Sequence, residues 1–137
     1  MVPTEGRDRR RNKRIVVGIC LAVGGLHFVT GPGYAGPFKV FVNGYLIDIL
    51  LPFAMFLLLG VQNLRYLHGK WVRSLLVFGV GAAAETSQYF GLEIFGRTFD
   101  PLDYVMFAIG IGSAALFEQA VLSRPIRRRA EKAPDRG

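Results

Sequence analysis

The chain of 137 residues has little cysteine, few acidic side chains and long stretches without charge. Its single cysteine, Cys20, excludes an internal disulfide and any metal site built on paired cysteines. There are 10 Asp and Glu against 17 Lys and Arg, which gives a net charge of +7. Charged residues make up 20% of the chain and hydrophobic ones 51%, and most basic residues gather in three short segments. Such segregation indicates a chain that meets a lipid bilayer.

The sequence also lacks the motifs of several common function classes. It has no phosphate-binding G-x-x-x-x-G-K-[ST] loop and no strand-led G-x-G-x-x-G. The basic segments flank apolar runs and show no aromatic interleaving, so no nucleic-acid partner is expected despite the positive charge. Membrane lipids with anionic headgroups are the expected partners of these segments. No cofactor and no metal ion are predicted from the residue spacing.

Four apolar segments predict an all-α fold, an integral membrane bundle of four transmembrane helices. A span needs about 20 residues, with roughly 17 as a practical minimum, so the two shorter segments borrow flanking residues. The segments cover residues 15–30, 45–61, 72–91 and 101–122. We therefore divide the chain into a basic tail (1–14), a transmembrane domain (15–122) and a second basic tail (123–137).

The basic residues predict the orientation of this bundle. Fifteen of the 17 lie in the two tails and in residues 62–73, which join the second and third segments, overlap the start of the third, and hold Arg65, Lys70 and Arg73. Lys and Arg are retained on the cytoplasmic side, so we expect a multi-pass protein of the cell membrane with both termini cytoplasmic. Reading the first segment as a cleaved signal peptide, with Ala35 at the cleavage site, would break this alternation, and no A-x-A site follows it. The oligomeric state stays open, a homo-oligomer included.

Small residues recur four positions apart inside three of the predicted spans. In lipid, helices associate by close backbone packing rather than by a hydrophobic drive, and small residues permit that approach. We expect helix contacts at three pairs, which are Gly18 with Ala22, Gly79 with Ala83, and Gly110 with Ala114.

This topology gathers polar side chains from four segments at the outer leaflet. Glu118 is different, because it faces the cytoplasmic end, where we expect the basic tail to pair with it. The predicted ligand-binding residues are His27, Asp48, Glu85, Gln88, Arg97, Asp100 and Asp103.

Several of these residues also have an ordinary structural explanation. Asp100 precedes Pro101 and is a natural N-cap of the last helix, and Asp103 lies in the first turn, where the helix dipole favours a carboxylate. Glu85 is harder to explain, because a carboxylate within a span costs at least about 2.5 kcal/mol on insertion scales. Arg97 is the nearest cation expected on its side of the membrane, and a structural ion pair between the two is an alternative to a functional site.

The stretch from Glu85 to Phe117 resembles the C-terminal half of the VanZ-like family of small membrane proteins. That family has Glu-x-x-Gln in a helix, then an Arg, an Asp-x-x-Asp and a Gly-rich last span. The residues that match are Glu85, Gln88, Arg97, Asp100, Asp103, Gly110 and Gly112. His27 also corresponds to a family histidine, whereas residues 104–108 lack the asparagine that often follows the second Asp.

The resemblance implies a protein that acts at the outer face of the membrane on envelope lipids or precursors. The family's namesake is associated with low-level resistance to the glycopeptide antibiotic teicoplanin. It does not imply a particular reaction.

Three hypotheses follow for the polar residues. In the first, Arg97 grips a phosphate or carboxylate of an anionic or lipid-linked envelope ligand, and Glu85 and Gln88 contact its polar head. In the second, the chain is an intramembrane enzyme with Glu85 and Asp103 as candidate catalytic acid and base, acting on a lipid-linked phosphate. Carboxylates with His27 could also hold a divalent cation, although no spacing is diagnostic. In the third, the residues form only a helix clamp in an assembly subunit.

Overall fold

The computed structural model describes residues 3–30, 33–62, 64–92 and 100–123, and within them all regular secondary structure is helical. This confirms the predicted all-α class, and the four long helices follow the four apolar segments. The long helices are α1 (Pro3–Val29), α3 (Leu46–Val61), α4 (Lys70–Tyr89) and α5 (Pro101–Phe117). Short helical elements join or extend them, namely α2 (Lys39–Gly44), η1 (Arg65–Leu67) and the π-helical turn η2 (Glu118–Leu122).

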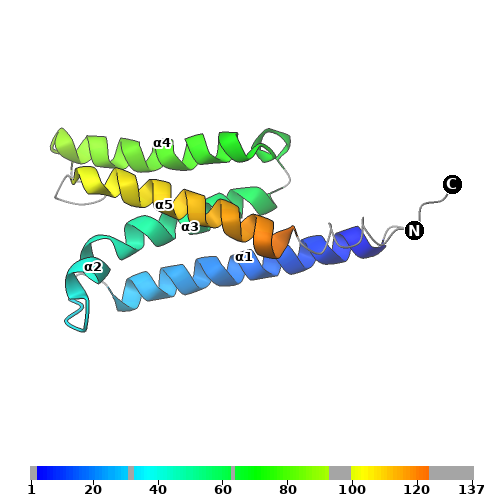
Figure 1. Ribbon diagram of the computed structural model, residues 1–137, viewed down its shortest axis with the longest axis horizontal. Helices are drawn as coiled ribbons and strands as arrows, with labels where there is room; N and C mark the ends of the chain where they lie inside the picture. Colours follow the sequence, from blue (N-terminus) through cyan, green and yellow to red (C-terminus); the bar gives the residue numbers. More distant parts are fainter. Residues whose placement is uncertain (1–2, 31–32, 63, 93–99, 124–137) are drawn as a thin grey trace.

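The helix α3 lies at the centre of the bundle and packs against α1, α4 and α5 (Figure 1). The helices α4 and α5 also pack against each other. Both α3 and α5 run from the left of Figure 1 to the right, and α4 runs the opposite way. The buried core is formed by apolar side chains from all four long helices, including Val16, Phe56, Val77 and Ile111.

The helix α1 is longer than the predicted first span. It begins at Pro3, so residues 3–14, which the charge pattern assigned to a tail, continue the same helix as the apolar run that starts at Ile15. The basic residues of this segment are therefore held on a helical surface. At the other end, α5 ends at Phe117, and the π-helical turn carries the chain to Leu122.

One of the three predicted small-residue contacts is confirmed. A Cβ atom at Gly110 would collide with the backbone carbonyl oxygen of Ile49, and Ala114 on the same face is fully buried. The backbones of α3 and α5 therefore approach each other closely at Gly110. The other two pairs are wrong as contacts within the described part of the chain, where nothing lies within 4 Å of a Cβ at Gly18 or Gly79.

Two helical stretches in the described residues are long and apolar enough to cross a membrane, Gly6–Val29 and Pro101–Leu122. The helix α3 is apolar but has only 16 residues. The helix α4 has 20 residues, but it carries Arg73 and Glu85 among its apolar side chains. The fold is thus an all-helical bundle in which α1 and the continuous stretch α5–η2 have the dimensions of membrane spans.

Candidate functional site

Four carboxyl groups meet at the end of the bundle where α3 and α5 begin and α4 ends. Asp48 lies in the first turn of α3, and Glu85 lies four residues before the end of α4. Asp100 caps α5, and Asp103 lies in its first turn. We call these four residues the acidic cluster. Its members come from three helices whose ends meet because α3 and α5 run in the opposite direction to α4 (Figure 1).

Asp100 confirms its predicted role as the N-cap of α5. Its Oδ1 accepts a hydrogen bond of 2.9 Å from the backbone N–H of Leu102, and Pro101 occupies the first helical position. Its Oδ2 accepts a second bond of 3.0 Å from the hydroxyl of Tyr45, the residue that precedes α3. Asp100 thereby links the starts of α3 and α5. Tyr45 was not among the predicted site residues, although its place three residues before Asp48 puts both near the same helix end.

Glu85 and Asp103 are the buried members of the acidic cluster, with 5% and 8% of their surfaces exposed. The Oε1 atom of Glu85 accepts a long hydrogen bond of 3.5 Å from the amide of Gln88, one turn further along α4. Its Oε2 atom is buried and has no partner of good hydrogen-bond geometry among the described residues. The backbone N–H of Asp100 and the carboxyl group of Asp103 lie close to Glu85, but neither makes a well-formed hydrogen bond with Oε2. Within the described residues Oε2 therefore lacks a well-aligned donor, which is costly for a buried carboxylate oxygen.

The members of the acidic cluster are close enough to repel one another when ionised. Asp103 interacts electrostatically with Asp48, Glu85 and Asp100. Asp48 interacts in the same way with Glu85 and Asp100. Within the described part of the chain, no ion pair joins these groups to a Lys, Arg or His side chain. Grouped carboxylates in a poorly hydrated site must share protons or accept a hydrogen-bond donor or cation. The cluster is therefore chemically suited to a partner that donates hydrogen bonds or carries positive charge.

Of the seven predicted ligand-binding residues, the structure brings five together, the acidic cluster and Gln88. Arg97 lies outside the described residues, so its pairing with Glu85 stays a prediction. His27 is exposed on the last turn of α1. Within residues 3–30, 33–62, 64–92 and 100–123, no three of the His, Cys, Asp and Glu side chains are arranged to hold a metal ion.

The two hydroxyl groups beside Glu85 are already engaged. The hydroxyl of Thr86 donates to the carbonyl of Ala82 at 2.6 Å, and that of Ser87 donates to the carbonyl of Ala84 at 2.6 Å. Neither hydroxyl donates to a basic side chain, which is the arrangement that activates a nucleophile. Any chemistry at this end of the bundle would therefore depend on the carboxyl groups.

A second buried polar group lies at the opposite end of the bundle, and the sequence did not predict it. Arg73 on α4 donates two hydrogen bonds to Glu118, Nη1 to Oε1 at 2.8 Å and Nη2 to Oε2 at 2.9 Å. Its guanidinium also lies 4.5 Å from the ring centroid of Phe56 on α3. Glu118 therefore has Arg73 as a partner, while its expected pairing with the basic tail involves residues 124–137, which lie outside the described residues. Arg73 was assigned to a connection, but it lies inside α4 and is 5% exposed.

No family model, curated protein or solved structure that was compared with the chain matches it.

Proposed function

We propose that the chain is a four-span protein of the cell membrane whose acidic cluster, at the outer leaflet, binds a cell-envelope ligand. The ligand class is a lipid, lipid-linked precursor or glycopeptide-like molecule that presents an amine or another hydrogen-bond donor. Two helices of spanning length and the basic segments beside the apolar helices support the membrane setting. The resemblance to the VanZ-like family favours the same face and the same class of ligand.

The observation that carries this proposal is that, within the described residues, Glu85 lies among carboxyl groups with no cation paired to it and no well-aligned donor to its Oε2 atom. A carboxylate that only stabilised helix packing would be balanced by a cation or fully hydrogen-bonded, as Glu118 is by Arg73. Glu85 instead lies beside three other carboxyl groups, and within the described residues its Oε2 atom makes no hydrogen bond of good geometry, with only the backbone N–H of Asp100 and the carboxyl group of Asp103 as nearby donors. A ligand ammonium group would supply both the missing hydrogen bond and the missing positive charge.

Arg97 extends this proposal to ligands that carry both charges. It belongs to the segment between α4 and α5, and its guanidinium is suited to bidentate contact with a phosphate or carboxylate. A headgroup with an ammonium beside a phosphate, such as that of phosphatidylethanolamine, offers one group to the acidic cluster and the other to Arg97. Phosphatidylethanolamine is therefore the first probe, with phosphatidylglycerol as the lipid that lacks the amine.

The test measures ligand binding by the purified full-length chain and by Glu85→Gln in neutral detergent. The thermal midpoint is recorded with increasing phosphatidylethanolamine, phosphatidylglycerol or teicoplanin, since a ligand that binds the folded state raises it. We expect an amine-bearing ligand to stabilise the wild type and Glu85→Gln to bind it about tenfold or more weakly, as for a lost charge-assisted hydrogen bond. Glu131→Gln, which removes one carboxylate from the basic C-terminal segment by the same substitution, is the matched control and should bind normally.

Two other results would redirect the proposal. In the first, Glu85→Gln fails to fold, Glu85→Asp folds, and no ligand raises the thermal midpoint of Glu85→Asp or of the wild type. The acidic cluster would then be only a helix clamp. Binding unchanged in a folded Glu85→Gln would contradict the proposal outright.

The alternative of an acid–base enzyme rests on the proximity of Glu85 and Asp103, two buried carboxyl groups that interact directly. Such a pair can hold one proton between its members and pass it to or from a substrate. On this alternative, a lipid-linked phosphate would be turned over, and Asp103→Asn would remove turnover while leaving binding measurable. Binding of that substrate without turnover would exclude the enzyme and leave the binding proposal standing.

A further inference from the structure

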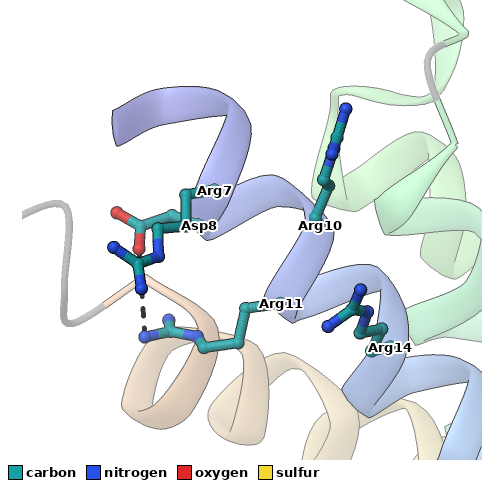
Figure 2. Close-up of a pocket in the computed structure, with 5 residues that line it drawn as sticks. All are labelled: Arg7, Asp8, Arg10, Arg11 and Arg14. Atoms are coloured by element: carbon teal, nitrogen blue, oxygen red, sulfur yellow. Dashed lines mark ion pairs between the residues drawn. The ribbon is translucent and has the colours of Figure 1, made fainter. Parts of the chain in front are cut away.

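Four arginines on the N-terminal part of α1 share one face of the helix. Arg7, Arg10, Arg11 and Arg14 follow the spacing i, i+3, i+4, i+7, which places side chains on the same side of an α-helix. Together with Asp8 they line a concave surface of about 550 Å³ (Figure 2). We call these four residues the arginine face.

The arginine face is directed away from the bundle. Asn12 and Val16 mark the side of α1 that meets the other helices, because Asn12 Nδ2 bonds to the carbonyl of Leu122 at 3.1 Å and Val16 is fully buried. Asn12 lies two residues after Arg10, and Val16 lies two residues after Arg14. Two residues correspond to a rotation of about 200° at 3.6 residues per turn, so these arginines lie on the opposite side of α1 from the bundle. All four arginines are exposed.

Among the described residues, the charge of the arginine face is only partly balanced. Arg11 pairs with Asp8 at 4.0 Å, and its guanidinium also donates to the side chain of Asn12 at 3.2 Å. The concave surface is thus lined by four guanidinium groups and one carboxylate. A surface pair at this distance contributes little, so the face keeps most of its capacity for an external anion.

The position of the face along α1 matches the depth of lipid phosphates. The apolar run begins at Ile15, directly after Arg14, within a helix that continues unbroken to Val29. From Arg7 to Arg14 the helix rises by about 10 Å. The polar region of a bilayer adds roughly 5–8 Å to each side of the hydrocarbon core. When the apolar run enters the core, the arginine face therefore crosses the headgroup layer, and Arg14 can reach it by snorkelling.

We propose that the arginine face is a binding site for the phosphate groups of anionic phospholipids in the leaflet where α1 enters the membrane. Guanidinium groups bind phosphate oxygens in pairs, and arginines one turn apart can hold one phosphate from two sides. This site requires α1 to enter a bilayer but does not require the acidic cluster to bind anything. It lies at the opposite end of α1 from His27.

The experiment compares two double variants that lose the same charge from different sides of α1. Arg7→Gln with Arg10→Gln removes half of the arginine face. Arg9→Gln with Lys13→Gln removes two exposed charges that lie off this face. Four of the six basic residues in the segment remain in each variant, so both keep the charge bias that orients the chain.

The full-length chain in neutral detergent is titrated with phosphatidylglycerol or phosphatidylcholine, and bound lipid is counted by native mass spectrometry. We expect the wild type to retain phosphatidylglycerol over phosphatidylcholine, and the Arg7/Arg10 variant to lose about tenfold in phosphatidylglycerol affinity. The Arg9/Lys13 variant should lose less than about threefold, because its charges act only at longer range.

Three outcomes would overturn the proposal. Equal losses in the two variants would mean that overall charge, and not the arginine face, attracts the lipid. Equal retention of the two lipids by the wild type would mean that no phosphate site of this kind exists. Tighter binding of a short DNA duplex than of phosphatidylglycerol, lost in the Arg7/Arg10 variant, would assign the face to nucleic acid instead. A failure of the acidic cluster to bind its ligand would leave all these measurements unchanged.

Discussion

The two buried polar groups of the bundle lie at opposite ends of the same pair of helices and are built differently. Arg73 and Glu85 are 12 residues apart on α4, which is about 18 Å along the axis. At the first end, Arg73 and Glu118 form a charge-balanced pair with two short hydrogen bonds. At the second, the acidic cluster combines four carboxyl groups from three helices, and the described residues pair none of them with a cation.

From this difference we assign a structural role to the first group and propose a functional role for the second. The Arg73–Glu118 pair satisfies itself and fixes how α4 meets the end of α5, with Phe56 of α3 against the guanidinium. The acidic cluster is incomplete without a proton, a cation or a donor from outside the described residues. Selection for stability alone would not favour four unbalanced carboxyl groups, two of them buried, because such groups destabilise the packed state. The free energy of unfolding and ligand binding, measured separately in the same variants, test this contrast.

The largest effect is expected from breaking the balanced pair. Arg73→Met leaves the Glu118 carboxylate without its partner and should lower the free energy of unfolding by about 3 kcal/mol, the lower end for a broken buried pair. The lower end applies because 24% of the Glu118 side chain is exposed. Unfolding in mixed micelles with increasing SDS measures this change. Ligand binding at the acidic cluster should persist in the fraction that stays folded.

The control for this prediction is the double variant Arg73→Met with Glu118→Met. Apolar residues of similar length should restore most of the lost stability, because both charges are removed together. Arg73 Nε is buried without a partner among the described residues, so its removal also relieves an unsatisfied donor. A double variant as unstable as Arg73→Met would show that the pair does more than balance charge.

A smaller effect is expected where α3 and α5 approach most closely. Gly110→Ala places a methyl group against the carbonyl of Ile49, which is backbone and cannot move aside, so we expect a loss of about 1–3 kcal/mol. Ile49 follows Asp48, so separating the helices should also weaken ligand binding at the acidic cluster. Gly112→Ala is the matched control, since nothing lies within 4 Å of its added Cβ, and its stability should not fall. Equal losses in the two variants would contradict the close approach.

Much of the architecture was predictable from the sequence because it depends on local patterns. Apolar runs of spanning length predicted the four long helices, and the Asp100–Pro101 pair predicted the cap of α5. The convergence of Asp48, Glu85 and Asp103 followed from topology alone, since helices that alternate in direction bring alternate ends together.

The sequence failed where a residue's partner depends on the rotation of one helix against another. Arg73 was grouped with Arg65 and Lys70 as a basic residue of the connection, yet α4 begins at Lys70 and turns Arg73 inward toward Glu118. For the same reason Gly110 and Ala114 form a contact while Gly18 and Gly79 face outward, although all three pairs share one spacing. The spacing of small residues predicts that a face exists but not which neighbour it meets.

The smallest effect is expected at Asp100. Its structural and proposed functional roles can be separated by comparing Asp100→Ala with Asp100→Asn, which replaces a single carboxylate oxygen by nitrogen. Asp100→Ala removes the N-cap of α5 and the acceptor for the Tyr45 hydroxyl, which should lower the free energy of unfolding by about 1–2 kcal/mol. Asp100→Asn keeps an oxygen that can accept from the Leu102 N–H, and its amide can donate to the Tyr45 hydroxyl oxygen in place of the acceptor it loses, so its stability should stay close to that of the wild type in SDS unfolding. If the charge of the acidic cluster attracts the ligand, Asp100→Asn should still bind an amine-bearing ligand more weakly than the wild type. Normal binding by Asp100→Asn would restrict the functional part of the cluster to Asp48, Glu85 and Asp103, and leave Asp100 as the cap that positions them.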